Sequence, residues 1–129
     1  MSFDWQQYYN LALALEADAA ATAGTLAEAK IRSAISRAYY AAHHKSKQYV
    51  ETTQRGVRIA PTGNAHQEVI DHLKHSRAHN DSKAGALLER LAKNRRDADY
   101  RPVFPGNVTA TAQSTLMMAK NVRSRGTVP

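Results

Sequence analysis

The stretch Lys93–Pro102, with the sequence KNRRDADYRP, lies at the end of a strongly periodic amphipathic segment and carries four cations, two carboxylates and a phenol. Five residues of this segment follow one another at steps of four, three, four and three: Ala84, Leu88, Leu91, Arg95 and Ala98. The spacing predicts a helix whose apolar face includes Arg95. Two interpretations of Arg95 remain open. Either it marks the end of a bundle, with its guanidinium reaching water or Asp99, or it belongs to a site for anions.

The remainder of the chain has the same helical periodicity, and no segment alternates as a strand would. Candidate cap residues are Ser2, Thr25 and Asn64, followed by Asp81 or Ser82. The expected helices run from Ser2 to about Asp18, from Leu26 to near Thr53, from Asn64 to near Arg77, from Asp81 through the opening stretch, and from Val108 to Ser124. We therefore predict an all-α protein, an up-and-down bundle of four main helices and one short helix.

Length and composition limit the possible classes of protein. The 129 residues predict a single domain over residues 1–126, with a frayed tail at 127–129. Cysteine is absent, which excludes a disulfide framework, a thiolate zinc site and a cysteine nucleophile. No apolar run approaches the roughly 18 residues needed to cross a bilayer, so we expect no membrane partner and a cytoplasmic location.

The formal net charge of +7 favours polyanionic partners, with nucleic acid as the first candidate. The alternative is that a modest basic excess only keeps the protein in solution.

The segment from Thr52 to Asn64 contains Gly56, Pro61 and Gly63 and predicts an exposed loop, in which Val57 and Ile59 are isolated apolar residues.

A polar row accompanies the apolar seam of the second helix. Arg37, Tyr40 and His44 recur at steps of three and four, so they share one flank of the helix. This flank is either a wall that binds phosphate or a base, or a solvated surface.

Four histidines lie in or around the third helix: His66, His72, His75 and His79. They lack the carboxylate or cysteine spacing of recognised metal sites, and no HExxH pattern occurs. We predict that these histidines are exposed, and we expect neither a metal nor a cofactor.

Two motifs together resemble a known family. The run Arg32–His43, RSAISRAYYAAH, is followed some fifty residues later by Arg95–Tyr100, RRDADY. The pair resembles the HEPN family, in particular its small stand-alone branch with an SRAYYA second helix and an R-x-x-A-D-Y segment before the last helix. The resemblance extends from the second helix to the last, and either motif alone would be weak.

The resemblance implies a HEPN-like helical bundle that forms a homodimer. In many relatives a charged cleft at the dimer interface cuts RNA without a metal, and the domain is often the toxin half of a pair with a nucleotidyltransferase-type antitoxin. The expected partners are therefore a second copy of the chain, RNA and such an antitoxin. The function implied is that of a toxin-like, metal-independent endoribonuclease.

The catalytic signature of the family, an arginine followed after four to six residues by a histidine, falls on Arg95 and Tyr100. A phenol with a pKa near 10 is a much poorer base at neutral pH than an imidazole with a pKa near 6.5, so enzymatic activity remains open. Arg37 and His43 have a similar spacing inside the second helix, which we interpret as coincidence. The expected catalytic residues are Arg95, Tyr100 and Asp99, and the expected RNA- or phosphate-binding residues are Arg96, Arg37, Tyr40, His44 and Arg101.

Two alternatives to catalysis also remain: a non-catalytic module that binds RNA, a nucleotide or a partner protein through the same basic residues, and a purely structural dimer.

Overall fold

The computed structural model describes residues 3–54 and 56–125, and every regular element in these ranges is helical. The five helices are α1 (Gln6–Ala19), α2 (Thr25–Thr53), α3 (Ala65–Lys74), α4 (His79–Tyr100) and α5 (Val108–Arg125). The predicted all-α fold is therefore confirmed.

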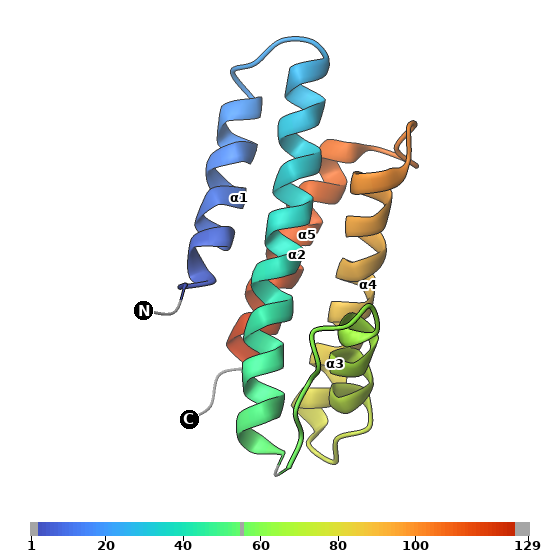
Figure 1. The fold of residues 1–129 in the computed structure, drawn as a ribbon. Coiled ribbons are helices and arrows are strands. Elements are labelled where there is room, and N and C mark those ends of the chain that lie inside the picture. Colours follow the sequence, from blue (N-terminus) through green and yellow to red (C-terminus); the bar gives the residue numbers. More distant parts are fainter. Residues whose placement is uncertain (1–2, 55, 126–129) are drawn as a thin grey trace.

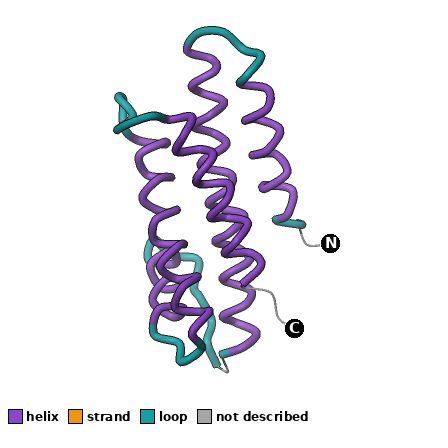
Figure 2. The backbone as a smooth tube through the Cα atoms, turned by 180° about the vertical axis from the view of Figure 1, so that it is seen from behind, coloured by secondary structure: helices purple, strands orange, loops and turns teal. Residues whose placement is uncertain are grey.

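The long helix α2 lies at the centre of the bundle and contacts each of the other four helices. Along the bundle axis α1, α2, α4 and α5 alternate in direction, as an up-and-down topology requires (Figure 1). The short helix α3 packs mainly against α4, near the end of the bundle where α2 finishes. The view from behind shows the same arrangement, with the segment between α2 and α3 running along the side of the bundle beside α3 (Figure 2).

The core follows the helical stripes of the sequence. All five residues of the predicted α4 stripe are buried, including Arg95, which is 9 % exposed. Small residues of α2 allow its neighbours to approach closely, because alanine adds only one carbon to the backbone; Ala34, Ala38 and Ala42 are fully buried. The predicted inward residues of α5 are also buried: Ala112, Leu116, Ala119 and Val122.

Several helix ends differ from the prediction. The predicted cap residue Thr25 is instead the first residue of α2, preceded by Gly24 with a φ of 71°, and the predicted cap Asn64 makes no side-chain cap hydrogen bond to α3. The prediction that Asp81 or Ser82 caps α4 is wrong, because this helix already begins at His79. Helix α3 ends at Lys74, before the predicted Arg77. The predicted cap at Ser2 and the tail at 127–129 lie outside the described residues.

Asp81 instead lies buried in the first turn of α4. Its carboxylate accepts hydrogen bonds of 2.7 Å from the hydroxyls of Tyr49 and Ser76. It thereby ties the end of α2 to the loop between α3 and α4.

The segment between α2 and α3 was predicted to be an exposed loop, and this is wrong for one residue. Ile59 is only 4 % exposed and belongs to the main core. Its backbone N–H donates to a carboxylate oxygen of Glu51 at 2.9 Å. An apolar side chain in a turn-rich segment thus anchors that segment to the bundle.

Among the helices of residues 3–54 and 56–125, none is long and apolar enough to cross a membrane.

Candidate functional site

Arg95 is a buried cation whose hydrogen bonding is incomplete. One carboxylate oxygen of Asp99 lies 3.6 Å from its Nη1 atom. Its Nε atom is buried and has no hydrogen-bond partner within the described part of the chain. A buried guanidinium normally has its donors satisfied, so the Nε–H of Arg95 is an exception: a buried donor left without an acceptor among the described residues.

Three aromatic rings surround the guanidinium of Arg95. Its Cζ atom lies 5.5 Å from the ring centre of Tyr39, 5.6 Å from that of Tyr40 and 5.8 Å from that of Tyr100. These distances are within the range of cation–π attraction. Tyr39 is fully buried whereas Tyr100 is 73 % exposed, so the group of rings extends from the core to the surface.

Two imidazoles complete this group. The hydroxyl of Tyr39 shares a hydrogen bond with Nδ1 of His66, at the start of α3. The ring of His43 lies 4.5 Å from that of His66. We call the six residues the Arg95 cluster: Arg95, Tyr39, Tyr40, Tyr100, His43 and His66.

The environment keeps Tyr39, His43 and His66 uncharged at neutral pH. Burial, reinforced by His66 and other nearby cations and imidazoles, lowers the pKa of His43 to about 3. Burial and then the charge of Arg95 lower the pKa of His66. Burial raises the pKa of the Tyr39 phenol, which outweighs the opposing effect of Arg95. At neutral pH the positive charge of the cluster therefore resides on Arg95.

The end of α4 is fixed by Arg32 of α2. Its Nη1 atom donates to the carbonyl oxygens of Ala98 and Arg101, and Nη2 donates to that of Pro102. The hydroxyl of Ser36, one turn along α2, donates to Asp99 at 3.3 Å. The two sequence motifs are thus in direct contact, and this contact positions the last turn of α4.

The predicted row of Arg37, Tyr40 and His44 is divided between two environments. Tyr40 faces Arg95, whereas the Cζ atom of Arg37 lies 4.9 Å from the ring centre of Tyr8 in α1. The ring of His44 stacks on Trp5 with 3.5 Å between centres and an interplanar angle of 12°. Burial lowers the pKa of His44 to about 4.

The other two predicted binding residues, Arg96 and Arg101, are exposed. The Nε atom of Arg101 lies 3.7 Å from a carboxylate oxygen of Asp97. Both arginines lie within a few residues of Tyr100 in the sequence, and both side chains are accessible to a polyanion in solution.

The prediction that all four histidines are exposed is wrong for two of them. His66 is half-buried in the Arg95 cluster and His72 is half-buried beside the end of α3, whereas His75 and His79 are exposed. In the described ranges no group of three or more histidines and carboxylates is placed to hold a metal ion.

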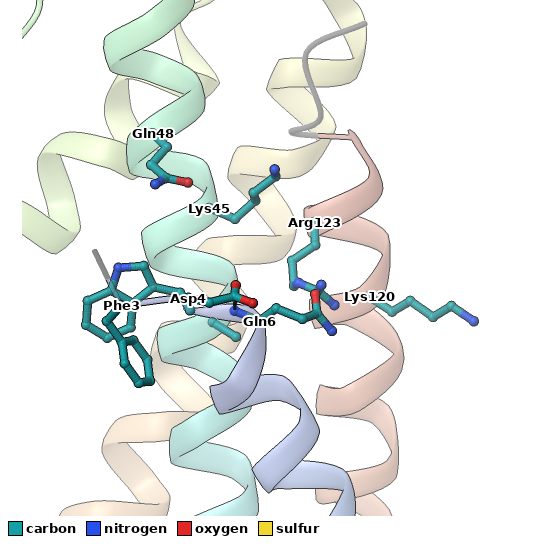
Figure 3. A pocket seen from close by; sticks show the side chains of 9 residues that line it. Phe3, Asp4, Gln6, Lys45, Gln48, Lys120 and Arg123 are labelled. Atoms are coloured by element: carbon teal, nitrogen blue, oxygen red, sulfur yellow. Dashed lines mark hydrogen bonds between the residues drawn. The ribbon is translucent and has the colours of Figure 1, made fainter. Parts of the chain in front are cut away.

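A separate hollow of about 380 Å³ lies beside the beginning of α1 (Figure 3). Lys45 and Arg123 approach it from α2 and α5, near Asp4, while the side chain of Lys120 extends away (Figure 3). Trp5 lines this hollow and also stacks on His44, so the hollow borders the predicted polar row.

Sequence reasoning did not find Tyr39, His43 and His66 as members of the site. Tyr39 and His43 are four residues apart and thus share one face of α2, which was a usable signal. The position of His66 depends on how α3 folds back onto the bundle, and the local sequence does not encode that contact.

The chain matches no protein-family model, no curated protein and no solved structure.

Proposed function

We propose that this chain is a HEPN-type, RNA-acting protein: a toxin-like, metal-independent endoribonuclease in which Arg95 stabilises the reacting phosphate and two copies form a homodimer. The main support is the buried guanidinium of Arg95, whose Nε atom has no partner in the described part of the chain. Burying a charge without full compensation is costly. A phosphate beside the guanidinium would supply a compensating charge.

Cutting RNA requires a base for the 2′-hydroxyl, a cation for the phosphate and a proton donor for the leaving oxygen, and we assign the last two to residues of the cluster. Arg95 is a cation for the charge that develops on the phosphate. Tyr100, whose ring lies beside that guanidinium and is 73 % exposed, is placed to orient the substrate or to donate to the leaving oxygen. The net charge of +7 favours the approach of RNA.

The homodimer enters the proposal through the family resemblance. The large apolar side chains on the surface, among them Leu26, Val103 and Met117, belong to different elements and do not by themselves argue for a second copy.

The second candidate function is non-catalytic binding of RNA, a nucleotide or a partner protein. It is favoured by Tyr100 itself, because a phenol replaces the histidine that the catalytic signature contains. The exposed ring of Tyr100 beside the guanidinium of Arg95 would also suit the binding of a base and its phosphate.

The test compares Arg95→Ala with Arg90→Ala, which removes the same charge from an exposed position on α4. Purified protein is incubated with labelled RNA in EDTA. We expect wild type and Arg90→Ala to cleave at rates within about twofold, and Arg95→Ala to be slower by about 100-fold or more, as when one stabilising donor is removed. Circular dichroism verifies that each variant is folded.

Wild-type binding without cleavage would support the non-catalytic alternative. The absence of both cleavage and salt-dependent binding would contradict both functions. Equal cleavage by wild type and Arg95→Ala would remove Arg95 from the mechanism.

A further inference from the structure

The Arg95 cluster contains an imidazole that is suited to replace the histidine missing at Tyr100. We propose that His66, oriented by the hydroxyl of Tyr39, accepts the proton of the attacking ribose 2′-hydroxyl. This inference rests on the proposed endoribonuclease activity, and it assigns a catalytic role to a residue of α3, outside both sequence motifs.

The other proton acceptors of the site are less suitable. His43 is only 4 % exposed, so a ribose has little access to it. One face of the His44 ring is covered by the stacked indole of Trp5. The Asp99 carboxylate already accepts a hydrogen bond from Ser36 and lies 3.6 Å from Arg95.

His66 combines access with a defined orientation. It is half-buried at the beginning of α3, at the boundary between the buried rings and solvent. Its Nδ1 atom faces the hydroxyl of Tyr39. The proposal takes the tautomer in which Nδ1–H donates a hydrogen bond to the phenol oxygen of Tyr39, because only this tautomer leaves the Nε2 lone pair on the opposite side of the ring free to accept a proton.

The charge state of the cluster agrees with this role. Burial and the nearby Arg95 lower the pKa of His66, so the imidazole is unprotonated at neutral pH and able to accept a proton. The raised pKa of the buried Tyr39 keeps its phenol neutral, so that it orients the imidazole without adding a charge.

In the proposed step, Nε2 of His66 takes the proton from the 2′-hydroxyl as the 2′-oxygen forms a bond to the neighbouring phosphorus. The bond from phosphorus to the 5′-oxygen breaks, and that oxygen is protonated by Tyr100 or by water. Arg95 stabilises the negative charge on the phosphoryl oxygens during the exchange. The products are a 2′,3′-cyclic phosphate and a 5′-hydroxyl; the proton on His66 returns to solvent, and a Tyr100 that has donated its proton regains one from solvent.

The test uses His66→Gln, with the exposed His75→Gln at the end of α3 as its matched control. Cleavage of labelled RNA in EDTA is followed across a range of pH. We expect wild type and His75→Gln to lose activity at acidic pH, with an inflection below the ordinary histidine pKa. We expect His66→Gln to be slower by about 100-fold or more and to lack that inflection.

Two further measurements separate catalysis from structure. RNA with 2′-O-methyl groups, which cannot be cleaved by this route, should bind wild type and His66→Gln with affinities within about twofold. In His66→Ala, added imidazole should restore part of the cleavage, whereas it should not affect Arg95→Ala.

If wild type cleaves and His66→Gln cleaves equally fast with the same pH profile, His66 is not the base, and the proposed nuclease function stands without it. If wild type binds RNA but does not cleave it, both the nuclease function and the role of His66 are overturned. If His66→Gln does not fold, Tyr39→Phe replaces it: a loss of about tenfold with a shifted inflection supports the proposal, and an unchanged profile overturns it.

Discussion

At the scale of single residues, the position of Arg95 was predictable and its surroundings were not. The step of four and three residues placed it on the buried stripe of α4, and the structure confirms its burial. The rings of Tyr39 and Tyr40 reach it from α2, more than fifty positions away in the chain. Periodicity gives the face on which a residue lies, but it does not give the residue that it meets across an interface.

The buried His43 should make the stability of the fold depend on pH. Its pKa is about 3 in the folded protein and near 6.5 when unfolded, so the unfolded state binds the proton more readily. The stability that comes from keeping His43 neutral is fully present above about pH 6.5 and is lost as the pH falls toward 3. Between about pH 8 and pH 5 this loss amounts to roughly 2 kcal/mol.

Urea unfolding of wild type and His43→Gln at these two pH values tests the prediction. The variant should be the less stable protein at pH 8, but its free energy of unfolding should change between the two pH values by roughly 2 kcal/mol less than that of wild type. The exposed His79→Gln should behave as wild type. An identical pH dependence in wild type and His43→Gln would contradict the assignment.

At the scale of helices, Gly85 sets the distance between α3 and α4. A Cβ atom at this position would lie 2.8 Å from Cγ of Lys74 and 3.0 Å from both Cβ of Leu73 and the backbone nitrogen of Lys74. A backbone atom cannot move aside as a flexible side chain can. The absence of a side chain at Gly85 therefore permits α3 to pack closely against α4.

We expect Gly85→Ala to be destabilising even though alanine is the better helix former. Overpacking costs about 1 to 3 kcal/mol, and the gain in helix propensity returns only about 1 kcal/mol. Because α3 carries His66, the variant should also slow RNA cleavage. Thermal unfolding and the cleavage assay measure the two effects.

Gly63→Ala is the matched control, since a Cβ atom at Gly63 meets nothing within 4 Å. It should alter stability by less than about 0.5 kcal/mol. A stabilised Gly85→Ala protein with unchanged cleavage would show that α3 adjusts its position without consequence for the site.

Helix interiors were easier to predict than helix ends. The apolar stripes of α4 and α5 determine their buried faces, and all of the predicted inward residues are buried. The start of α4 was misplaced because Asp81, a typical cap residue, serves instead as a buried acceptor for Tyr49 and Ser76. A residue type common at caps does not reveal which donors the fold brings to it.

At the scale of the whole molecule, the number of helices and their up-and-down order could be predicted from the sequence. The sequence did not predict that residues from three different helices form the Arg95 cluster. Tyr39 and His43 belong to α2, His66 to α3, and Arg95 to α4. These residues meet only when α3 folds back onto the bundle, an arrangement set by long-range packing.

The basic charge of the molecule should make RNA binding depend on salt. We expect the logarithm of the affinity for single-stranded RNA to fall linearly with the logarithm of the salt concentration, with a slope of about 0.7 for each phosphate contacted. If the hollow in Figure 3 contacts one of these phosphates, Lys45→Ala should reduce the slope by about that amount.

Fluorescence anisotropy at several salt concentrations measures the slope. Lys83→Ala is the control, because it removes an exposed charge near the beginning of α4, away from the residues that line the hollow. If Lys45→Ala and wild type show the same dependence of affinity on salt concentration, the hollow does not contact a phosphate of the bound RNA.

The contact between Arg32 and the end of α4 also has an electrostatic consequence. The last carbonyl groups of a helix carry a partial negative charge, equivalent to about half an elementary charge, which would repel a phosphate. Arg95 and Tyr100 lie in the last two turns of α4, close to that negative pole. By donating to the carbonyls of Ala98, Arg101 and Pro102, Arg32 satisfies these acceptors and counteracts part of their repulsion, while its own charge is shared with the carboxylate of Glu28 at 2.8 Å. A residue that holds the helix end in place thus also makes the surroundings of Arg95 more favourable to an anion.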